Sequence, residues 1–175
     1  MRIGVISDTH GLLRPEAVSA LRGVDHVLHG GDVGGEDVLA ALRELAPVTA
    51  VAGNIDGFRC GEAGETARVV LGGVKFFLTH ILDRPHRPRP EVQAELRRAP
   101  ADVIVFGHSH LPHDEVIDGV RYFNPASAGP RRFDYPVSVG ILEIERKRVV
   151  RSSFVPLDAR SEPALERRMN QLSRR

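Results

Sequence analysis

Apolar and polar positions alternate in blocks through the first half of the chain. Short β-branched runs predict strands at residues 2–7, 25–29 and 48–52, each followed by a polar residue or a glycine. Between these runs, apolar residues recur at helical spacing, which predicts helices at residues 15–21 and 36–45. Strands that alternate with helices are joined by right-handed crossovers. The pattern therefore predicts a parallel sheet for this half.

The second half is dominated by hairpin signals. Residues 67–71 and 74–79 flank Gly72-Gly73, a pair typical of a two-residue hairpin turn. Further strands are predicted at 102–106, 114–117, 120–123, 137–144 and 149–155, and helices at 90–98 and 162–172. Together the two halves predict an α/β sandwich that mixes parallel and antiparallel strands.

Composition narrows the possible classes of protein. A chain of 175 residues and 19.2 kDa is long enough for one core, so we expect a single domain over 1–175 with a helical tail at 160–175. The single Cys excludes an intrachain disulfide framework and a cysteine-rich metal site. A net charge of +1 gives no signal for a nucleic-acid or membrane surface. Without a long apolar run near residue 1, we expect a cytoplasmic protein.

Metal-ligating side chains follow five of the predicted strands. In open α/β sheets, sites form beyond the carboxyl ends of strands. Carboxylate, imidazole and amide oxygen are suitable ligands for divalent metals. The strand-end residues of these types are Asp8, His10, Asp32, Asn54, His80, His108 and His110. Their joint occurrence favours a metal site over seven unrelated turn or cap residues.

This ordered series resembles the calcineurin-like metallophosphoesterase superfamily. The form Asp8-Thr-His-Gly11 and the later Asn124-Pro-Ala-Ser127 resemble its small single-domain bacterial and archaeal phosphodiesterase branch, which also contains the retromer scaffold subunit. The resemblance covers about residues 1–145. It implies a four-layer αββα sandwich of mixed parallel and antiparallel sheets, the metallophosphoesterase fold.

The resemblance also implies a centre with two divalent ions, manganese first, with iron, nickel or zinc as other candidates. Asp32 would bridge the ions, and a hydroxide bridging them would attack phosphorus. The catalytic contributions of Asp32 and Asn54 would act through the metals. The remaining implied ligands are Asp8, His10 and His110 for one ion, and Asn54, His80 and His108 for the other.

Two positions depart from the family pattern. Ile55 stands where many members carry a His that serves as the leaving-group acid, and Ile81 stands where Gly is usual, so the loop after His80 is expected to follow another path. Asp56 is a candidate to orient a metal-bound His. Arg131 could bind the substrate phosphate or form a structural ion pair.

The predicted function is a metal-dependent phosphodiesterase, a phosphoric diester hydrolase that acts on a small-molecule substrate. One alternative is a non-catalytic metal-binding interaction scaffold. Another is a phosphomonoesterase or nucleotidase, although nine Phe and Tyr and no Trp offer little for stacking a base. The aliphatic hairpins leave open a homo-oligomer formed through a sheet edge.

Overall fold

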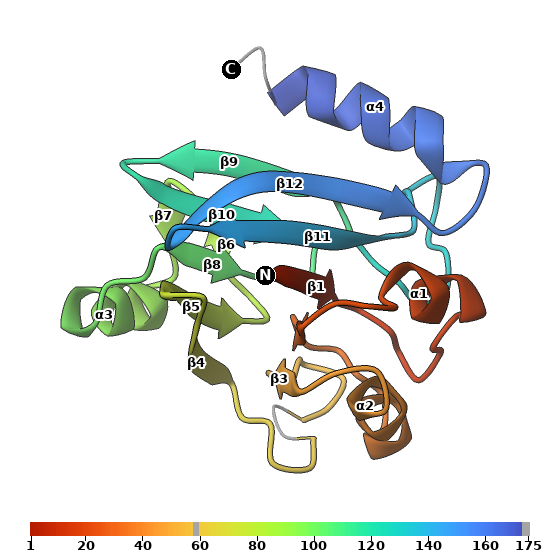
Figure 1. Ribbon diagram of the computed structural model, residues 1–175, viewed down its shortest axis with the longest axis horizontal. Coiled ribbons are helices and arrows are strands. Elements are labelled where there is room, and N and C mark those ends of the chain that lie inside the picture. The colour runs from red at the N-terminus through yellow and green to blue at the C-terminus, as the bar shows by residue number, and fades with distance from the viewer. Residues whose placement is uncertain (58–59, 173–175) are drawn as a thin grey trace.

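Two five-stranded sheets pack face to face in the computed structural model, which describes residues 1–57 and 60–172 (Figure 1). The first sheet has the order β12 (Arg148–Pro156), β11 (Ser138–Glu145), β1 (Arg2–Ile6), β2 (His26–His29), β3 (Val48–Ala50). The second has the order β4 (Thr66–Leu71), β5 (Val74–Thr79), β8 (Val103–Val105), β10 (Val120–Asn124), β9 (His113–Ile117).

The strand directions match the sequence pattern where consecutive strands pair. β1, β2 and β3 are parallel, and the hairpins β4–β5, β9–β10 and β11–β12 are antiparallel, as predicted. The pairing of β8 between β5 and β10, parallel to both, joins strands that are distant in sequence. The mixed character of both sheets is thereby confirmed.

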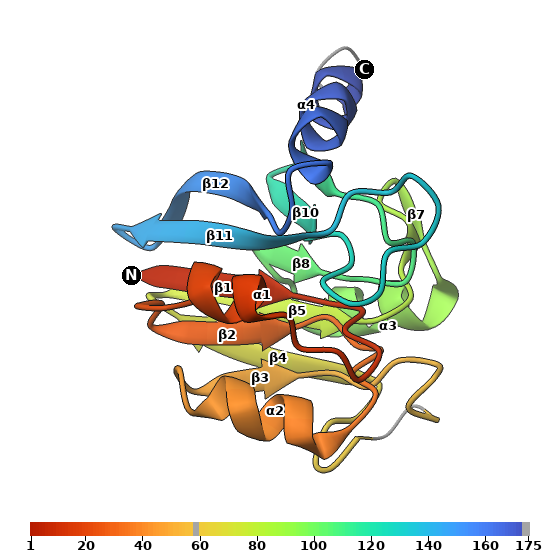
Figure 2. The same cartoon turned by 90° about the vertical axis from the view of Figure 1, so that its right-hand side faces the viewer.

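Helices cover the outer faces of the two sheets. Helices α1 (Pro15–Ala20) and α2 (Glu36–Arg43) bury Ala17, Leu39 and neighbouring apolar residues against the first sheet. Helix α3 (Pro90–Arg98) packs Val92 against the outer face of the second sheet. Between the sheets lies a separate core that includes Phe123, stacked on Phe154 at 5.1 Å between ring centroids. These layers confirm the predicted αββα sandwich (Figure 2).

Helix α4 (Ser161–Leu172) has a different place from the other helices. It packs against β9 and β12, the edge strands on one side of the two sheets, and buries Leu165 there. Figure 1 shows it running along β12 at the top of the molecule. The amphipathic pattern of residues 162–172 is explained by this contact, which covers the edge between the sheets. No helix in the described part of the chain is long and apolar enough to cross a membrane.

The segment after His80 forms a small hairpin. Strands β6 (Asp83–Arg84) and β7 (Arg87–Pro88) pair antiparallel, and Leu82 is buried just before them. Ile81 has a negative φ. Together with His80 and Val92 it lines a cavity of about 80 Å³. The chain therefore leaves the site toward α3.

Candidate metal centre

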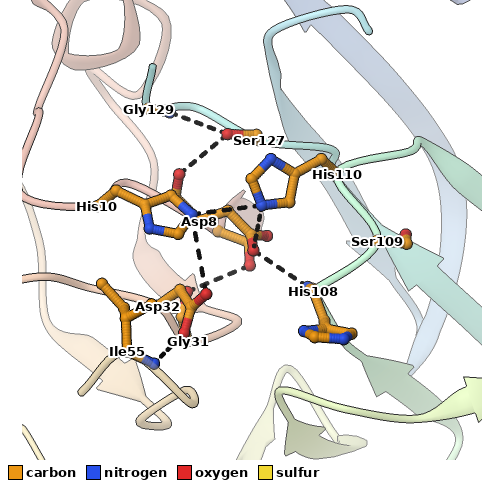
Figure 3. Close-up of polar contacts among 12 residues, drawn as sticks. Asp8, His10, Gly31, Asp32, Ile55, His108, Ser109, His110, Ser127 and Gly129 are labelled. Atoms are coloured by element: carbon orange, nitrogen blue, oxygen red, sulfur yellow. Dashed lines mark hydrogen bonds and ion pairs between the residues drawn. The ribbon is translucent and has the colours of Figure 1, made fainter. Parts of the chain in front are cut away.

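All seven predicted ligands lie on loops at one edge of the sandwich. Strands β1, β2 and β3 of one sheet and β5 and β8 of the other end at this edge, so loops from both sheets meet there. Figure 3 shows Asp8, His10, Asp32 and His110 pointing toward one another, with the backbone N–H of His108 against Asp8. The structure thus brings together side chains as far apart in sequence as Asp8 and His110.

Left-handed backbone turns aim most of these side chains. Five of the seven ligand positions have φ between 49° and 67°, namely Asp8, His10, Asp32, His108 and His110. Asp and His are among the non-glycine residues that tolerate this region best. Such conformations cost free energy and are concentrated at functional sites. Each turn changes the direction of the backbone directly after a strand.

The imidazoles form two pairs. The rings of His10 and His110 lie 5.2 Å apart, with 3.3 Å between their Nε2 atoms. The rings of His80 and His108 lie 5.3 Å apart and nearly perpendicular. The pairing agrees with the division of histidines between two ions that the resemblance implies.

Asp32 lies between the two pairs of histidines. Its Oδ1 is 3.3 Å from His80 Nε2, and its Oδ2 is 3.8 Å from His10 Nε2. The backbone N–H of Ile55 donates to Oδ1 at 3.0 Å. Burial by itself raises the pKa of Asp32, but the facing His80 ring and the Ile55 N–H outweigh it, and the pKa is lowered. The carboxylate is held ionised and oriented toward both sides.

Asp8 faces the His10 side from the floor of the site. It is fully buried, and its Oδ1 lies 3.3 Å from His110 Nε2 and accepts the backbone N–H of His108 at 3.1 Å. Its other oxygen, Oδ2, is buried without a hydrogen-bond partner among the described residues. A buried carboxylate oxygen left in this state is unfavourable unless a cation occupies the adjacent space.

His80 is fixed by a backbone carbonyl. Its Nδ1 lies 2.8 Å from the carbonyl oxygen of Gly30, which accepts a hydrogen bond when this nitrogen carries the proton. Its Nε2 lies 3.3 Å from Asp32 Oδ1 but is not hydrogen-bonded to it. Burial lowers the pKa of His80, but Asp32, Asp8 and the Gly30 carbonyl raise it above its ordinary value. An Nδ1–H bonded to a carbonyl, with Nε2 free, is the usual arrangement of a metal-binding His.

Asn54 and His108 occupy the exposed rim. Asn54 Oδ1 lies 3.1 Å from His108 Nδ1 and accepts a hydrogen bond when this nitrogen carries the proton. Burial lowers the pKa of His108, and the charge on His80 lowers it further, which favours the neutral ligand form. Both side chains adjoin the His80 side of Asp32.

These donors fit divalent metal ions. Among residues 1–57 and 60–172, two groups of three ligand atoms lie within 4.8 Å of one another: Asp8, His10 and His110, and Asp8, Asp32 and His80. The first group is the one implied for one ion. The second contains Asp8 together with Asp32 and His80, so Asp8 as well as Asp32 faces both halves of the site. Unpartnered Asp8 Oδ2 and His80 Nε2 are consistent with metal ligation.

His29, the last residue of β2, supports the ligand loops. It is fully buried; its Nδ1 accepts the N–H of Gly31 at 3.2 Å, so its Nε2 carries the hydrogen and donates to Thr9 Oγ1 at 3.0 Å. The Thr9 hydroxyl in turn donates to the Val33 carbonyl at 2.8 Å. Burial lowers the pKa of His29 to about 4. The neutral ring ties the loop after β1 to the loop after β2.

Asp56 bonds backbone groups instead of a metal-binding His. Its carboxylate accepts the N–H groups of Val33 (2.9 Å), Gly34 (2.8 Å) and Gly53 (2.8 Å). The prediction that Asp56 contacts a metal-binding histidine is therefore wrong, because its carboxylate is bonded to backbone amides instead. The reason is that the turn after Asn54 places the carboxylate over three unpaired amides. Asp56 fixes the loops that carry Asp32 and Asn54.

Arg131 forms the structural ion pair that was one of its two interpretations. Its guanidinium donates to both oxygens of Asp158 at 2.7 and 2.6 Å, and also to Tyr135 O and Ser161 Oγ. Burial alone raises the pKa of Asp158, but Arg131 and Ser161 outweigh it and lower the pKa. With these bonds formed, Arg131 is committed to the fold and does not face the ligands.

Two further residues support the site without having been identified as site residues in the sequence. Asn124 Nδ2 donates to the Gly107 carbonyl at 2.8 Å, which holds the loop that bears His108 and His110. Ser127 Oγ donates to the Asp8 carbonyl at 3.0 Å (Figure 3). The segment Asn124-Pro-Ala-Ser127 entered the resemblance, but no spacing rule shows that its side chains bond these particular carbonyls.

A metal-ligand cluster at the shared edge of two mixed sheets defines this chain as a metallophosphoesterase-fold protein. Residues 1–147 match the calcineurin-like phosphoesterase superfamily domain, and the chain belongs to that family. A probable metallophosphoesterase of Methanothermobacter thermautotrophicus is 37% identical over 158 residues, which are 85% of this chain and 89% of that protein. A phosphodiesterase of Methanocaldococcus jannaschii is 28% identical over 165 residues, 84% of this chain and 95% of its own.

Solved structures show the same fold. A predicted phosphoesterase of Streptococcus pneumoniae superposes with a TM-score of 0.71 at 25% identity and covers 94% of each chain. Vps29 of Entamoeba histolytica, complexed with Zn²⁺, superposes with a TM-score of 0.66 at 24% identity over 90% of this chain and 100% of its own. The second likeness bears on the fold alone.

Gly31 provides a test of how tightly His80 must be held. A Cβ at Gly31 would lie 2.7 Å from both Cβ and Nδ1 of His80. We expect Gly31→Ala to displace His80 and to weaken metal binding by about 10- to 100-fold in calorimetric titration. Gly23→Ala is the matched control, because Gly23 also has a positive φ (+73°) but nothing within 4 Å of the added Cβ. Equal metal affinity in the two variants would contradict the prediction.

The neutral state of His29 predicts a pH dependence of stability. Its pKa is lowered from 6.5 to about 4 in the fold. Below pH 6.5 His29 is protonated in the unfolded chain but stays neutral in the folded chain until the pH approaches 4. The free energy of unfolding therefore falls as the pH falls. The loss is on the order of 2 kcal/mol at pH 5 and 3 kcal/mol below pH 4.

Urea unfolding at several pH values, with a chelator present to remove bound metal, measures this loss. In His29→Gln the side chain cannot titrate, so the fall between pH 7 and pH 5 should be smaller by roughly 2 kcal/mol. Superimposable pH profiles for the two proteins would show that His29 does not refuse the proton.

Proposed function

We propose that this chain is a metal-dependent phosphodiesterase that hydrolyses a small-molecule phosphodiester at a centre of two divalent ions. The observation that carries the proposal is the position of Asp32, whose two oxygens face separate pairs of histidines. A shared carboxylate lowers the repulsion between neighbouring dications. The similarity to the phosphodiesterase of Methanocaldococcus jannaschii favours a diester substrate.

Each half of the site would hold one ion, with manganese as the first candidate and iron, nickel or zinc as alternatives. Asp32 would be shared. When bound, two such ions supply a nucleophile from water near neutral pH and neutralise charge on the phosphoryl oxygens. The proposed ligands are Asp8, His10 and His110 on one side, and Asn54, His80 and His108 on the other.

The chain's own residues would bind and orient. Asp32 stays ionised through its lowered pKa, and Ile55 N–H fixes the direction of Oδ1. His80 presents Nε2 because the Gly30 carbonyl engages Nδ1. Asn54 would contribute its amide oxygen from the rim, where a substrate can approach. Ligands whose orientation is set in advance lose little entropy when they engage metal or substrate.

The leaving group would depart without a protein acid at residue 55. Ile55 is about half exposed beside Asp32 and carries no proton (Figure 3). Protonation would come from water or from the substrate itself. This favours substrates whose leaving group is stable as an anion.

An interaction scaffold is the second candidate, since the fold is shared with Vps29. The complete set of seven ligating side chains and the unpartnered Asp8 Oδ2 favour the enzyme. A phosphomonoesterase remains the third. A single domain over 1–175, a cytoplasmic location and a homo-oligomer stay predictions.

Manganese binding and hydrolysis of bis-p-nitrophenyl phosphate test the proposal together. The purified chain should bind two ions per molecule and release p-nitrophenolate in their presence, and a chelator should abolish the release. Asp32→Ala should lose both ions and reduce kcat/KM by roughly a thousand-fold or more, because it removes the shared ligand. Metal content is measured by elemental analysis after gel filtration.

Asp37→Ala is the control, because Asp37 is an exposed carboxylate in the first turn of α2 and its loss should change neither value. Two bound ions with no turnover of diesters or monoesters would favour the scaffold. Near-normal turnover in Asp32→Ala would exclude the shared-ligand assignment.

Ile55 leads to a prediction about leaving groups. In a series of aryl phosphodiesters, log kcat/KM should fall steeply as the leaving-group pKa rises, because no side chain supplies a proton at residue 55. Ile55→His should flatten the dependence, chiefly for the poorest leaving groups. A flat dependence in the unmodified protein would contradict the assignment and point to another acid.

A further inference from the structure

The loop of residues 129–135 begins against the wall of the metal centre. Gly129 N–H donates to the Asp8 carbonyl at 3.1 Å, and a Cβ on Gly129 would lie 2.3 Å from Thr9 O. Arg14 Nε donates to the Gly129 carbonyl at 3.1 Å and anchors the loop from the other side. Figure 3 shows Ser127 and Gly129 beside Asp8 and His10. The residues that follow Gly129 therefore leave from the His10 side of the site.

Adjacent arginines in this loop have opposite roles. Arg131 is tied to Asp158, Ser161 and the Tyr135 carbonyl. Arg132 is exposed, and its guanidinium makes no hydrogen bond or ion pair with any part of the chain described. Arg132 follows Gly129 by three residues, and Gly129 is bonded to the Asp8 carbonyl at the wall of the site. A free guanidinium is thus carried by the segment that leaves the His10 side of the centre.

Phe133, the next residue in the chain, presents an exposed apolar ring. It is 83% exposed, and its φ is +51°, a conformation that a bulky residue rarely adopts. The turn is closed by a hydrogen bond from Tyr135 N–H to the Arg132 carbonyl at 3.2 Å, and the Phe133 ring lies 5.5 Å from that of Tyr135. The fold gains almost no burial from Phe133 while it accepts backbone strain. Such strain is typical of segments that act on ligands.

On the basis of the proposed phosphodiesterase function, we propose that Arg132 binds a nonbridging oxygen of the substrate phosphoryl group and that Phe133 packs against an aromatic or heterocyclic ester group that stays on phosphorus after hydrolysis. Arg is suited to phosphate because its guanidinium is always charged and makes charge-assisted hydrogen bonds to phosphate oxygens. The exposed ring supplies a flat apolar surface for a planar group. The substrate class is therefore a phosphodiester with an aryl or nucleoside ester group on the His10 side.

The bonding of Arg131 makes it a matched comparison for Arg132. Removal of Arg131 breaks the pair with Asp158, so Arg131→Ala should lower the midpoint of thermal unfolding. Arg132→Ala should leave that midpoint unchanged, since it breaks no bond within the fold. Arg146→Ala removes an equal charge from the β11–β12 turn, at the end of the sheet where β1 begins, and controls for net charge.

The experiment uses manganese-loaded protein and two substrates that release the same p-nitrophenolate, namely bis-p-nitrophenyl phosphate and methyl p-nitrophenyl phosphate. Arg132→Ala should raise KM for both by about ten-fold with kcat changed by less than about two-fold, the loss expected for one charge-assisted hydrogen bond. Phe133→Ala should raise KM about three- to ten-fold for the bis-aryl ester only. Calorimetry with inorganic phosphate should show an about ten-fold weaker Kd in Arg132→Ala.

These readouts separate this proposal from the proposed function. If the loaded protein hydrolyses neither ester but Arg132→Ala still weakens phosphate binding, the phosphodiesterase function fails and the assignment of Arg132 stands. If the esters are hydrolysed and Arg132→Ala leaves both KM and phosphate affinity unchanged, the assignment of Arg132 is overturned. Equal effects in Arg146→Ala would also overturn it, because they would show long-range charge alone. Equal KM changes for both esters in Phe133→Ala would overturn the role of the ring.

Discussion

The burial of two carboxylates beside several imidazoles is the constraint on which the rest of the structure depends. Asp8 and Asp32 are almost fully enclosed, and Asp8 Oδ2 has no hydrogen-bond partner among the described residues. Charge in such a place is unfavourable unless an opposite charge is close. Histidine rings lie on either side of these carboxylates, and a neutral imidazole is a suitable ligand for a cation. A divalent cation is therefore a natural occupant of the space between these groups.

Holding these groups in place requires supports that do not themselves ligate. The His29–Thr9 contact joins the loops after β1 and β2, Asp56 joins the loops after β2 and β3, and Asn124 holds the loop after β8. Each support pairs a side chain with backbone groups that would otherwise remain unsatisfied at a strand end. The left-handed turns at the ligand positions are stable because these bonds compensate their conformational cost.

The loop of residues 129–135 extends the same principle from metal to substrate. Arg131 donates hydrogen bonds to Asp158 and Ser161, and these bonds fix the loop to the start of α4. Its neighbour Arg132 is exposed, and so is the ring of Phe133, the next residue. A rigid anchor next to a free cation is a suitable base for a binding residue. The ion pair of Arg131 with Asp158 thus links this loop to the start of α4.

The sequence by itself determined the elements and the ligand types. Periodicity indicated the strands and helices other than the short β6–β7 hairpin, because burial imposes a local repeat of two or 3.6 residues. Glycine and ligand side chains at strand ends identified the metal chemistry, and Gly72-Gly73 identified a hairpin. Only the tertiary structure decided which partner each polar group has. It paired β8 with β5 and β10, turned Asp56 to three amides, made His29 a support and separated Arg131 from Arg132. The physical reason is that hydrogen bonds and ion pairs depend on distances between loops far apart in sequence, which no local pattern encodes.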